Sequence, residues 1–298
     1  MGVGRTRRPF SFSGARSALV NSAATFATPR NVGRYFGFKA MRATVEFVWH
    51  RQVRSGDLAA ELTDRFVSDG AVVVDVGASW GLFSYHLARK VGGSGTLFSF
   101  EPHPMNKAVL EKLAKSRPNV HFRPVAASDL TGSADMQVPV FGSRHVTAQS
   151  SIAHGFDGQH GVRVEKVTVP TVRLDDEIGD QRIDFIKIDV EGHELSVLRG
   201  ASVMLRKYLP PMLIEIEQRH LDHPIKDVFA EIEDIGYALY FIDGPALRPV
   251  EEFDLEKHQL SCVVPDEFTP FSMPEGYVYN FCAVARPELL SGAPGFAG

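Results

Sequence analysis

The chain has 298 residues, of which 44% are hydrophobic, and this is enough for a sizeable core in one large domain or two small ones. Its two cysteines, Cys262 and Cys282, are isolated, so the sequence indicates neither a zinc knuckle nor a disulfide framework and favours a reducing compartment. No hydrophobic run approaches the roughly 20 residues of a membrane span. We therefore expect no transmembrane segment and a cytoplasmic location.

Positive charge is concentrated at the start of the chain. Residues 1–45 contain seven arginines, one lysine and no acidic residue, whereas the whole chain has a net charge of −4. This segment is typical of a disordered basic tail, which we favour, or of an organellar transit peptide. The acidic remainder argues against nucleic-acid binding. We expect a helical lead-in at 46–70, a main domain at 71–286 and a flexible tail at 287–298.

Strands and helices alternate in the first half of the chain. Leu58, Leu62 and Phe66 recur on one face of an expected helix over 57–67. Continuous hydrophobic runs are typical of strands buried on both faces of a parallel sheet. They predict strands at 72–76, 96–100 and about 120–125. Helices are expected between them, at 82–90 and from Pro104 onward, the second with a buried stripe of Met105, Val109, Leu110 and Leu113.

Residues 130–175 interrupt this alternation. Their segments alternate in hydrophobicity around the polar stretch 142–151, which predicts a β-rich insertion with a mobile loop that could cover a site. The alternation then resumes and predicts a doubly wound α/β sheet. The later strands are expected at 185–189, 212–216, 237–242 and 278–284, and the later helices at 194–207 and 228–235, with disorder from 291.

A glycine turn, Asp75-x-Gly77-x-x-x-Gly81, follows the first expected strand. Glycine permits unusual dihedral angles and a close approach to a ligand, and open α/β sheets bind ligands at the carboxyl ends of their strands. A dinucleotide site would normally show Gly-x-Gly-x-x-Gly, which this segment lacks. A buried Asp75 needs a partner, for which the ammonium group of an amino-acid-like ligand is one candidate. The alternative is a tight turn without a ligand.

Glu101 ends the second expected strand, about 20 residues after the glycine turn. A carboxylate at that place can accept hydrogen bonds from both hydroxyls of a ribose. The alternative is a solvated acid at the end of a strand. Taken together, the turn and Glu101 indicate a ligand that contains adenosine.

Acidic residues also follow the strand at 185–189. Asp189 is expected to face the cofactor pocket, and Glu191 and His193 to lie within reach of a substrate as candidate bases. Histidine titrates nearest neutrality, and burial can raise the pKa of a carboxylate toward it. Glu191 and Glu194 could instead simply begin a helix, where an acid interacts favourably with the helix dipole, and for Glu194 this is the better interpretation.

Two further groups give weaker indications. His220 and His223, beside Glu215 and Glu217, could form a metal site, but a solvated loop is the better interpretation and no metal is expected. Trp49 and Trp80 could form aromatic walls of a pocket, or their indole rings could pack in the core or on the surface.

Three segments together resemble the FkbM family of methyltransferases: Val-Val-Asp-Val-Gly-Ala-Ser-Trp-Gly, Phe-Glu-Pro-His-Pro and Ile-Lys-Ile-Asp-Val-Glu-Gly-His-Glu. The resemblance covers roughly residues 55–286. Shorter similar segments are Ala126-Ala-Ser-Asp129 with Gly132, Leu174-Asp-Asp176, Leu198-Arg-Gly-Ala201 and Asn280-Phe281. The family implies a class I methyltransferase fold, a Rossmann-like and mostly parallel seven-stranded sheet. It also implies S-adenosylmethionine as cofactor and, usually, O-methylation.

The resemblance assigns roles to individual residues. Asp189 and Glu191 would lie at the reaction centre, with His193 as a further candidate base. Ser79 stands where the family usually has Asn, which we expect to alter the loop in detail without loss of binding. The residues implied to bind the cofactor are Asp75, Gly77, Ser79, Gly81, Glu101, Ser128, Asp129 and Asp189.

The resemblance implies in-line methyl transfer to a small molecule, sugar or lipid. One rival is a nicotinamide-dependent oxidoreductase, against which the missing third glycine argues. Another is a cofactor-binding module without catalysis, against which the acids at Asp189 and Glu191 argue. The sequence predicts neither the acceptor nor the oligomeric state.

Overall fold

The computed structural model describes residues 46–51, 57–141, 144–145, 150–152, 162–262, 274 and 276–296. The expectations for the basic segment 1–45, and for most of the loop at 142–151, lie outside these residues. A sheet of eight strands forms the centre of the molecule, in the order β11-β10-β12-β9-β8-β1-β2-β3. The strands are β1 (Val72–Val76), β2 (Thr96–Phe100), β3 (Val120–Arg123), β8 (Phe185–Ile188), β9 (Met212–Glu215), β10 (Ala238–Asp243), β11 (Ala246–Pro249) and β12 (Asn280–Val284).

The strand directions make the fold doubly wound. β1 pairs in parallel with β2 on one side and with β8 on the other, so the strand order reverses between β1 and β8. β12 is antiparallel to both β9 and β10. The predicted Rossmann-like class I methyltransferase fold is confirmed. The prediction of seven strands was one too few, because the short β11, in which only Leu247 is buried, pairs with β10 as an eighth.

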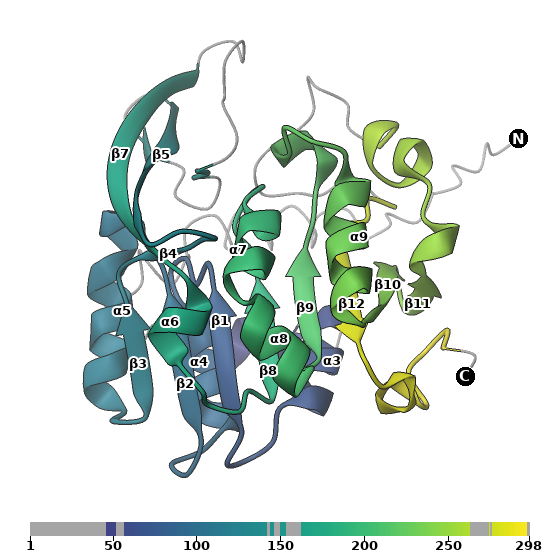
Figure 1. The fold of residues 1–298 in the computed structure, drawn as a ribbon, viewed down its shortest axis with the longest axis horizontal. Helices are drawn as coiled ribbons and strands as arrows, with labels where there is room; N and C mark the ends of the chain where they lie inside the picture. Colours follow the sequence, from purple (N-terminus) through teal and green to yellow (C-terminus); the bar gives the residue numbers. More distant parts are fainter. Residues whose placement is uncertain are drawn as a thin grey trace, which may run out of the picture.

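Helices cover both faces of this sheet (Figure 1). One face packs against α6, α7, α8 and α9 through the largest hydrophobic cluster, and the other against α3, α4 and α5 through two smaller ones. Both faces of the central strands are therefore buried, as their continuous hydrophobic runs predict. The helices are α3 (Leu58–Phe66), α4 (Leu82–Lys90), α5 (Pro104–Ser116), α6 (Leu174–Ile178), α7 (Glu194–Gly200), α8 (Ser202–Tyr208) and α9 (Ile225–Ile235).

A second sheet of four strands, in the order β4-β7-β5-β6, confirms the β-rich insertion. Its β5 and β7 form a long antiparallel ribbon that rises above the main sheet (Figure 1). The strand expected at 120–125 ends at Arg123 instead, because the chain then crosses to the second sheet as β4. The four strands are β4 (Ala126–Ala127), β5 (Gly132–Phe141), β6 (Arg144–His145) and β7 (Val162–Val172).

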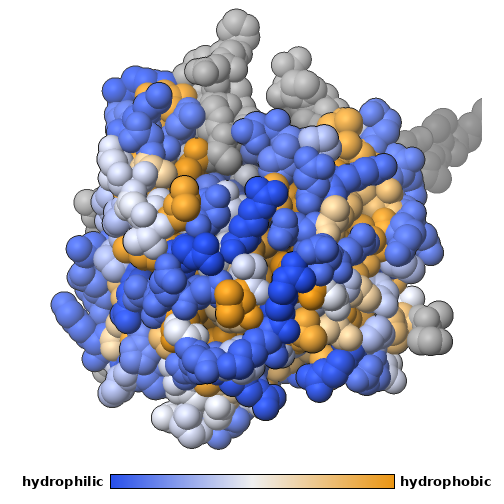
Figure 2. Space-filling model, viewed as in Figure 1, coloured by the Kyte–Doolittle hydropathy of each residue, from blue (hydrophilic) through white to orange (hydrophobic). Residues whose placement is uncertain are grey.

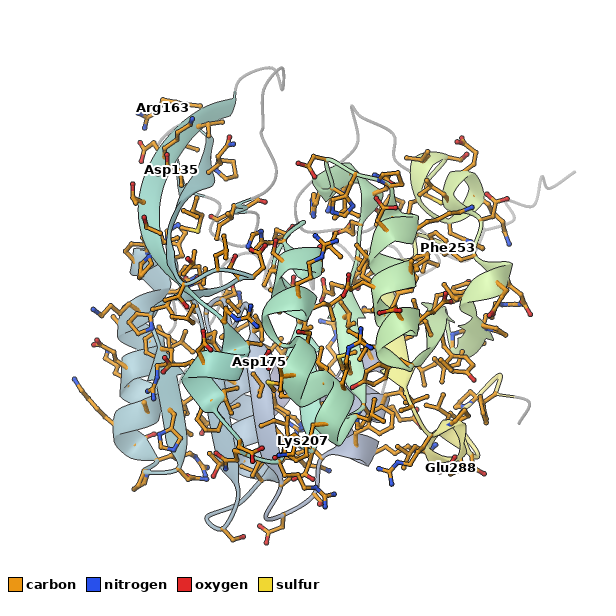
Figure 3. The ribbon with its side chains drawn as sticks, viewed as in Figure 1. Asp135, Arg163, Asp175, Lys207, Phe253 and Glu288 are labelled. Carbon is orange, nitrogen blue, oxygen red and sulfur yellow. The ribbon has the colours of Figure 1, made fainter. Side chains whose placement is uncertain are left out.

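The single helix expected at 194–207 is divided into α7 and α8. Gly200 ends α7 where it meets the chain beyond β4, since a Cβ on Gly200 would lie 1.9 Å from the Ser128 carbonyl oxygen. Asp175 of α6 then caps α8 by accepting hydrogen bonds from the Val203 and Met204 N–H groups at 3.0 and 2.9 Å (Figure 3). The break between α7 and α8 is caused by close backbone packing, which cannot be predicted from hydrophobic periodicity.

One expectation about burial was wrong, and one segment expected to be flexible is partly packed. Met105 is 40% exposed, because His103 caps α5 and turns Asn106, not Met105, toward the interior. The end of the chain is packed up to residue 296. Leu290 is fully buried, and the Pro294 carbonyl accepts a hydrogen bond from the Leu247 N–H of β11.

The surface seen in Figure 2 is mostly hydrophilic, with hydrophobic side chains in small separate groups. Among the residues described, no helix has both the length and the hydrophobicity to cross a membrane.

Candidate active site

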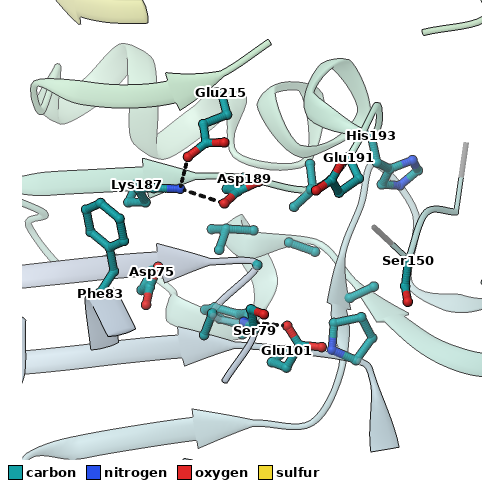
Figure 4. A pocket seen from close by; sticks show the side chains of 18 of the residues that line it. Asp75, Ser79, Phe83, Glu101, Ser150, Lys187, Asp189, Glu191, His193 and Glu215 are labelled. Atoms are coloured by element: carbon teal, nitrogen blue, oxygen red, sulfur yellow. Dashed lines mark hydrogen bonds and ion pairs between the residues drawn. The ribbon is translucent and has the colours of Figure 1, made fainter. Parts of the chain in front are cut away.

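A cavity of about 290 Å³ opens at the carboxyl ends of β1, β2, β8 and β9, where the strand order reverses (Figure 4). This is the place where open α/β sheets bind ligands. Most of the charged and polar side chains that line it come from strand ends or from the turns after them. Among the described residues, the complete set of these charged and polar residues is Asp75, Ser79, Glu101, Ser150, Lys187, Asp189, Glu191, His193 and Glu215.

Asp75 lies at the bottom of the cavity, 1% exposed, next to the end of β1. Its carboxylate accepts a 2.5 Å hydrogen bond from the Ser84 hydroxyl, which also lies 2.8 Å from the Ser99 hydroxyl. Burial raises the pKa of Asp75 to about 6, although the nearby Lys187 opposes the rise. This acid therefore has a partner inside the protein, in addition to any ligand.

The glycine turn brings β1 against β8. Gly77 has a φ of +81°, and a Cβ there would lie 1.7 Å from the Asp189 carbonyl oxygen, so only glycine fits. Ser79 has a φ of +50°, a conformation that asparagine adopts more readily than serine. Serine in place of the family's usual asparagine therefore makes the backbone conformation of the turn less favourable, an effect that the sequence alone does not show.

Glu101 joins the turn to the start of α5. One carboxylate oxygen accepts a 2.7 Å hydrogen bond from the Ser79 N–H, and the other accepts from the His103 N–H at 2.8 Å and from Asn106 at 3.3 Å. Burial raises the pKa of Glu101 to about 7, against these hydrogen bonds, which lower it. The carboxylate is fixed in the cavity wall before any ligand binds.

Lys187 is the buried cation of the cavity, with a side chain only 2% exposed. Its ammonium lies 3.1 Å from Asp189 and 3.5 Å from Glu215, and 4.8 Å from the centre of the Phe83 ring (Figure 4). Burial favours the neutral amine, but the two carboxylates outweigh it and raise the pKa of Lys187. Lys187 therefore stays charged and is not a base.

Glu191 lies beyond the end of β8, in the turn before α7. Its carboxylate is 2.8 Å from the Nδ1 of His220, in the short helix η2 (Gln218–His220) that follows β9. Burial, with the neighbouring Asp189 and Glu217, raises the pKa of Glu191 well above the ordinary value. Glu191 therefore keeps its proton to higher pH than an ordinary glutamate carboxyl does.

The remaining expected residues are placed less uniformly. His193 lines the cavity, and its Nε2 lies 2.9 Å from the Ser128 hydroxyl, which also contacts Asp129. Ser128 and Asp129 do not themselves line the cavity, nor does Gly81, which starts α4 with a φ of +90°. Burial lowers the pKa of His193, so this histidine is predominantly neutral near pH 7.

Hydrophobic side chains enclose the cavity. Trp80 and Phe83 line it from the α4 side, and Met136 of β5 and Ile152, which packs beside Met136, line it from the insertion. Trp49 does not reach it and instead stacks on His86, with ring centres 3.7 Å apart. The insertion thus contributes to the cavity wall, as expected.

Sequence reasoning did not assign Lys187 or Glu215 to this site. The sequence signal was the alternation of Lys187 and Asp189 between isoleucines, since residues two apart in a strand share a face. Glu215 adjoins them only because β9 pairs with β8.

The residues of the alternative metal site do not lie together in the way that the sequence suggested. Glu215 contacts Lys187, and His223 lies 3.9 Å from Asp227. Glu191, Glu217 and His220 have ligand-type atoms within 4.8 Å of one another. However, both Glu217 oxygens contact the Arg219 guanidinium, at 2.8 and 3.1 Å. This group is a closed ion-pair network.

Acidic groups outnumber basic ones around the cavity. Asp75, Glu101, Asp189, Glu191 and Glu215 line it, whereas Lys187 is the one lysine or arginine among its described lining residues. Carboxylates in excess favour a cationic ligand and disfavour an anionic one.

Residues 70–239, more than half of the chain, match the FkbM methyltransferase domain. Methyltransferase 1 of Beauveria bassiana (strain ARSEF 2860) is 26% identical in an alignment of length 179, which covers 54% of this chain and 69% of that protein. The FkbM methyltransferase of Methylobacillus flagellatus KT gives a TM-score of 0.45 at 20% identity. The match covers 72% of this chain and 44% of that one, so the chain spans less than half of that protein. Aeropyrum pernix fibrillarin, solved with natively bound S-adenosyl-L-methionine, gives 0.39 at 13% identity, covering 73% and 67%. By its matched domain, the chain belongs to the FkbM family of methyltransferases.

Proposed function

We propose that this protein is an S-adenosylmethionine-dependent methyltransferase that O-methylates a hydroxyl group of a small molecule, sugar or lipid. The observation that carries the proposal is the acid-rich cavity at the switch point of the sheet, in a chain of a methyltransferase family. A cofactor with a sulfonium and an ammonium group suits that charge. A nicotinamide dinucleotide, with its anionic diphosphate, does not. We assign the activity to residues 71–286.

The residues present fit this cofactor. The fixed carboxylate of Glu101 can accept hydrogen bonds from ribose hydroxyls, and the buried Ser79 hydroxyl has no hydrogen-bond partner among the residues that the structure describes. The carboxylates of Asp75 and Asp189, which line the cavity together with Gly77, would hold the cationic amino-acid end of the cofactor. When bound, S-adenosylmethionine would supply an activated methyl group on its sulfonium.

The chain's own contribution to the reaction is position, charge and proton removal. Lys187 holds Asp189 and Glu215 in place through its two ion pairs. Glu191 and His193 lie on the side of the cavity away from Glu101 (Figure 4). A carboxylate or imidazole there can take the proton of an acceptor hydroxyl, and positioning of that hydroxyl can lower the barrier by several kcal/mol.

The test is methyl transfer followed by mass spectrometry. The protein is incubated with methyl-labelled S-adenosylmethionine and a metabolite extract of its source organism, and labelled products are sought. Asp189→Asn and Glu191→Gln should each lower the labelling rate by about 100-fold or more. If neither substitution changes the rate, both residues are removed from the mechanism. If wild-type protein instead oxidises NADH with components of the extract, the protein is an oxidoreductase.

A further inference from the structure

The turn that carries Glu191 is packed tightly against η2. Gly192 has a φ of +100°, and a Cβ on it would lie 2.1 Å from the His220 carbonyl oxygen. The backbones of the turn and of η2 therefore touch with no room for a side chain between them. A shift of His220 would move the turn with it.

Glu191 itself has a strained backbone, with a φ of +54° in a residue that is not glycine. Its carbonyl accepts a hydrogen bond from the hydroxyl of Ser151, a residue that forms an isolated β-bridge with Gln137 of β5. Strained residues of this kind persist only where their surroundings hold them, and they cluster at functional sites. The strain turns the Glu191 side chain to a place where it both lines the cavity and meets His220.

The side-chain contact is a direct one between buried groups. Nδ1 of His220 lies 2.8 Å from a Glu191 oxygen, and His220 is only 7% exposed. The same nitrogen lies 3.7 Å from Glu217, whose oxygens are bound by Arg219. With its proton on Nδ1, the imidazole donates to Glu191, while Arg219 satisfies Glu217 behind it.

We propose that His220 is the positioning residue for Glu191, and that Glu191 is the carboxylate that takes the proton of the acceptor hydroxyl. This inference rests on the proposed function. In the step concerned, the acceptor O–H bond breaks, its electron pair stays on the oxygen, and the proton goes to a Glu191 oxygen. His220 contacts neither the acceptor nor the cofactor in this arrangement and acts through its hydrogen bond to Glu191.

Charged groups on three sides set the protonation of Glu191. Asp189 at the end of β8 and Glu217 before η2 favour the protonated carboxyl, whereas Lys187 and Arg219 favour the carboxylate. Glu215 of β9 and Glu194 of α7 also interact electrostatically with Glu191, and as acids they favour its protonated form. A hydrogen bond from His220 also favours the carboxylate. Loss of that bond should therefore move the ionisation of Glu191, and the rise of activity with it, to higher pH.

The first experiment needs no acceptor. Two-bond ¹H–¹⁵N spectra of ¹⁵N-histidine-labelled protein report the tautomer and pKa of each ring. We expect the proton of neutral His220 on Nδ1, and we expect Glu191→Gln to lower the pKa of His220 by about one unit while leaving His193 unchanged. The matched control is Asp129→Asn, which should lower the pKa of His193 and not that of His220. A proton on Nε2 of His220, or no response to Glu191→Gln, would overturn the pairing.

The second experiment compares two replacements of His220. Asparagine places an amide donor near the position of Nδ1, whereas leucine provides none. Both variants should bind S-adenosylmethionine as wild type does, since His220 does not line the cavity. With labelled cofactor and the extract, His220→Leu should lose about tenfold in rate. Its pH profile should move up by about one unit. His220→Asn should keep about half of the wild-type rate and the wild-type profile.

The outcomes separate this inference from the proposed function. If wild type binds no S-adenosylmethionine, the proposed function fails. If wild type binds and transfers methyl groups but His220→Leu keeps its rate and pH profile, the positioning role fails. Equal losses in the two variants would also contradict it, because the donor would then not matter. Activity that a chelator abolishes and that Mg²⁺ restores would also contradict the positioning role of His220.

Discussion

The two halves of the cavity hold their acids in different ways. In the first half, from β1 and β2, Glu101 is bound by neighbouring backbone N–H groups and Asp75 by a serine hydroxyl. In the second half, from β8 and β9, Asp189 and Glu215 are bound by a cation, and Glu191 by an imidazole. Local hydrogen bonds give a preformed wall, whereas ion pairs between elements give a site whose charges depend on one another.

The largest effect is expected where the halves touch. Gly77→Ala would force the new Cβ into the Asp189 carbonyl, separating β1 from β8, and should lower the free energy of unfolding by about 4 kcal/mol or more. The control is Gly70→Ala, which has the same φ of +81° but whose new Cβ would meet only the Ser94 hydroxyl, at an ordinary contact distance of 3.7 Å. It should cost only about 1–2 kcal/mol. Guanidinium unfolding measures both, and equal losses would show that conformational strain alone matters at Gly77.

The second half depends on its buried cation. Lys187→Met leaves Asp189 and Glu215 without their partner in a buried place, so unfolding should become easier by about 3–5 kcal/mol. The matched control, Lys207→Met, removes an exposed partner of Asp180 at the far end of the sheet and should have no measurable effect (Figure 3). Adding Glu215→Leu to Lys187→Met should recover part of the loss. If Lys187→Met is as stable as wild type, the second half is not held by this cation.

The first half should respond in binding more than in stability. Glu101→Gln places an amide N–H₂ against the Ser79 or His103 N–H and removes the charge that faces a ribose, so affinity for S-adenosylmethionine should fall about 10- to 100-fold. Glu111→Gln, at a residue of α5 that does not line the cavity, should leave affinity unchanged and serves as the control. Calorimetric titration measures both. An unaltered affinity in Glu101→Gln would place the ribose elsewhere.

The smallest effect is a linkage between cofactor binding and protons. Burial raises the pKa of Asp75 to about 6 and of Glu101 to about 7, so part of each population is protonated near pH 6. A cationic ligand favours the ionised carboxylates. Binding should therefore release protons, and affinity should rise between about pH 6 and 8, by at most about tenfold per pH unit for each proton. Titrations in buffers of different ionisation enthalpy count these protons. Proton uptake would mean that the ligand's charge does not meet these acids.

The sequence predicts the first half well because its signals are local. Asp75, Gly77 and Glu101 belong to one strand-turn-helix-strand unit, and the structure places all three in the cavity wall. It predicts the second half poorly because the contacts join distant segments. The pairing of Glu191 with His220, 29 positions further along the chain, depends on how η2 follows β9.

The fold shows the same contrast. Continuous hydrophobic runs locate the buried strands, but the break between α7 and α8 depends on where Gly200 meets Ser128, and the packing of Leu290 depends on β11 and β12. Neither contact leaves a periodic pattern in the sequence.

The most direct test of the central claim is isothermal titration of the wild-type protein with three ligands. They are S-adenosylmethionine, S-adenosylhomocysteine, whose sulfur is an uncharged thioether, and NADH. We expect one binding site per chain for each of the first two ligands and no binding of NADH. The affinity for S-adenosylmethionine should be higher at pH 8 than at pH 6. No heat with millimolar S-adenosylmethionine, or tighter binding of NADH, would contradict a cavity built for a cationic methyl donor.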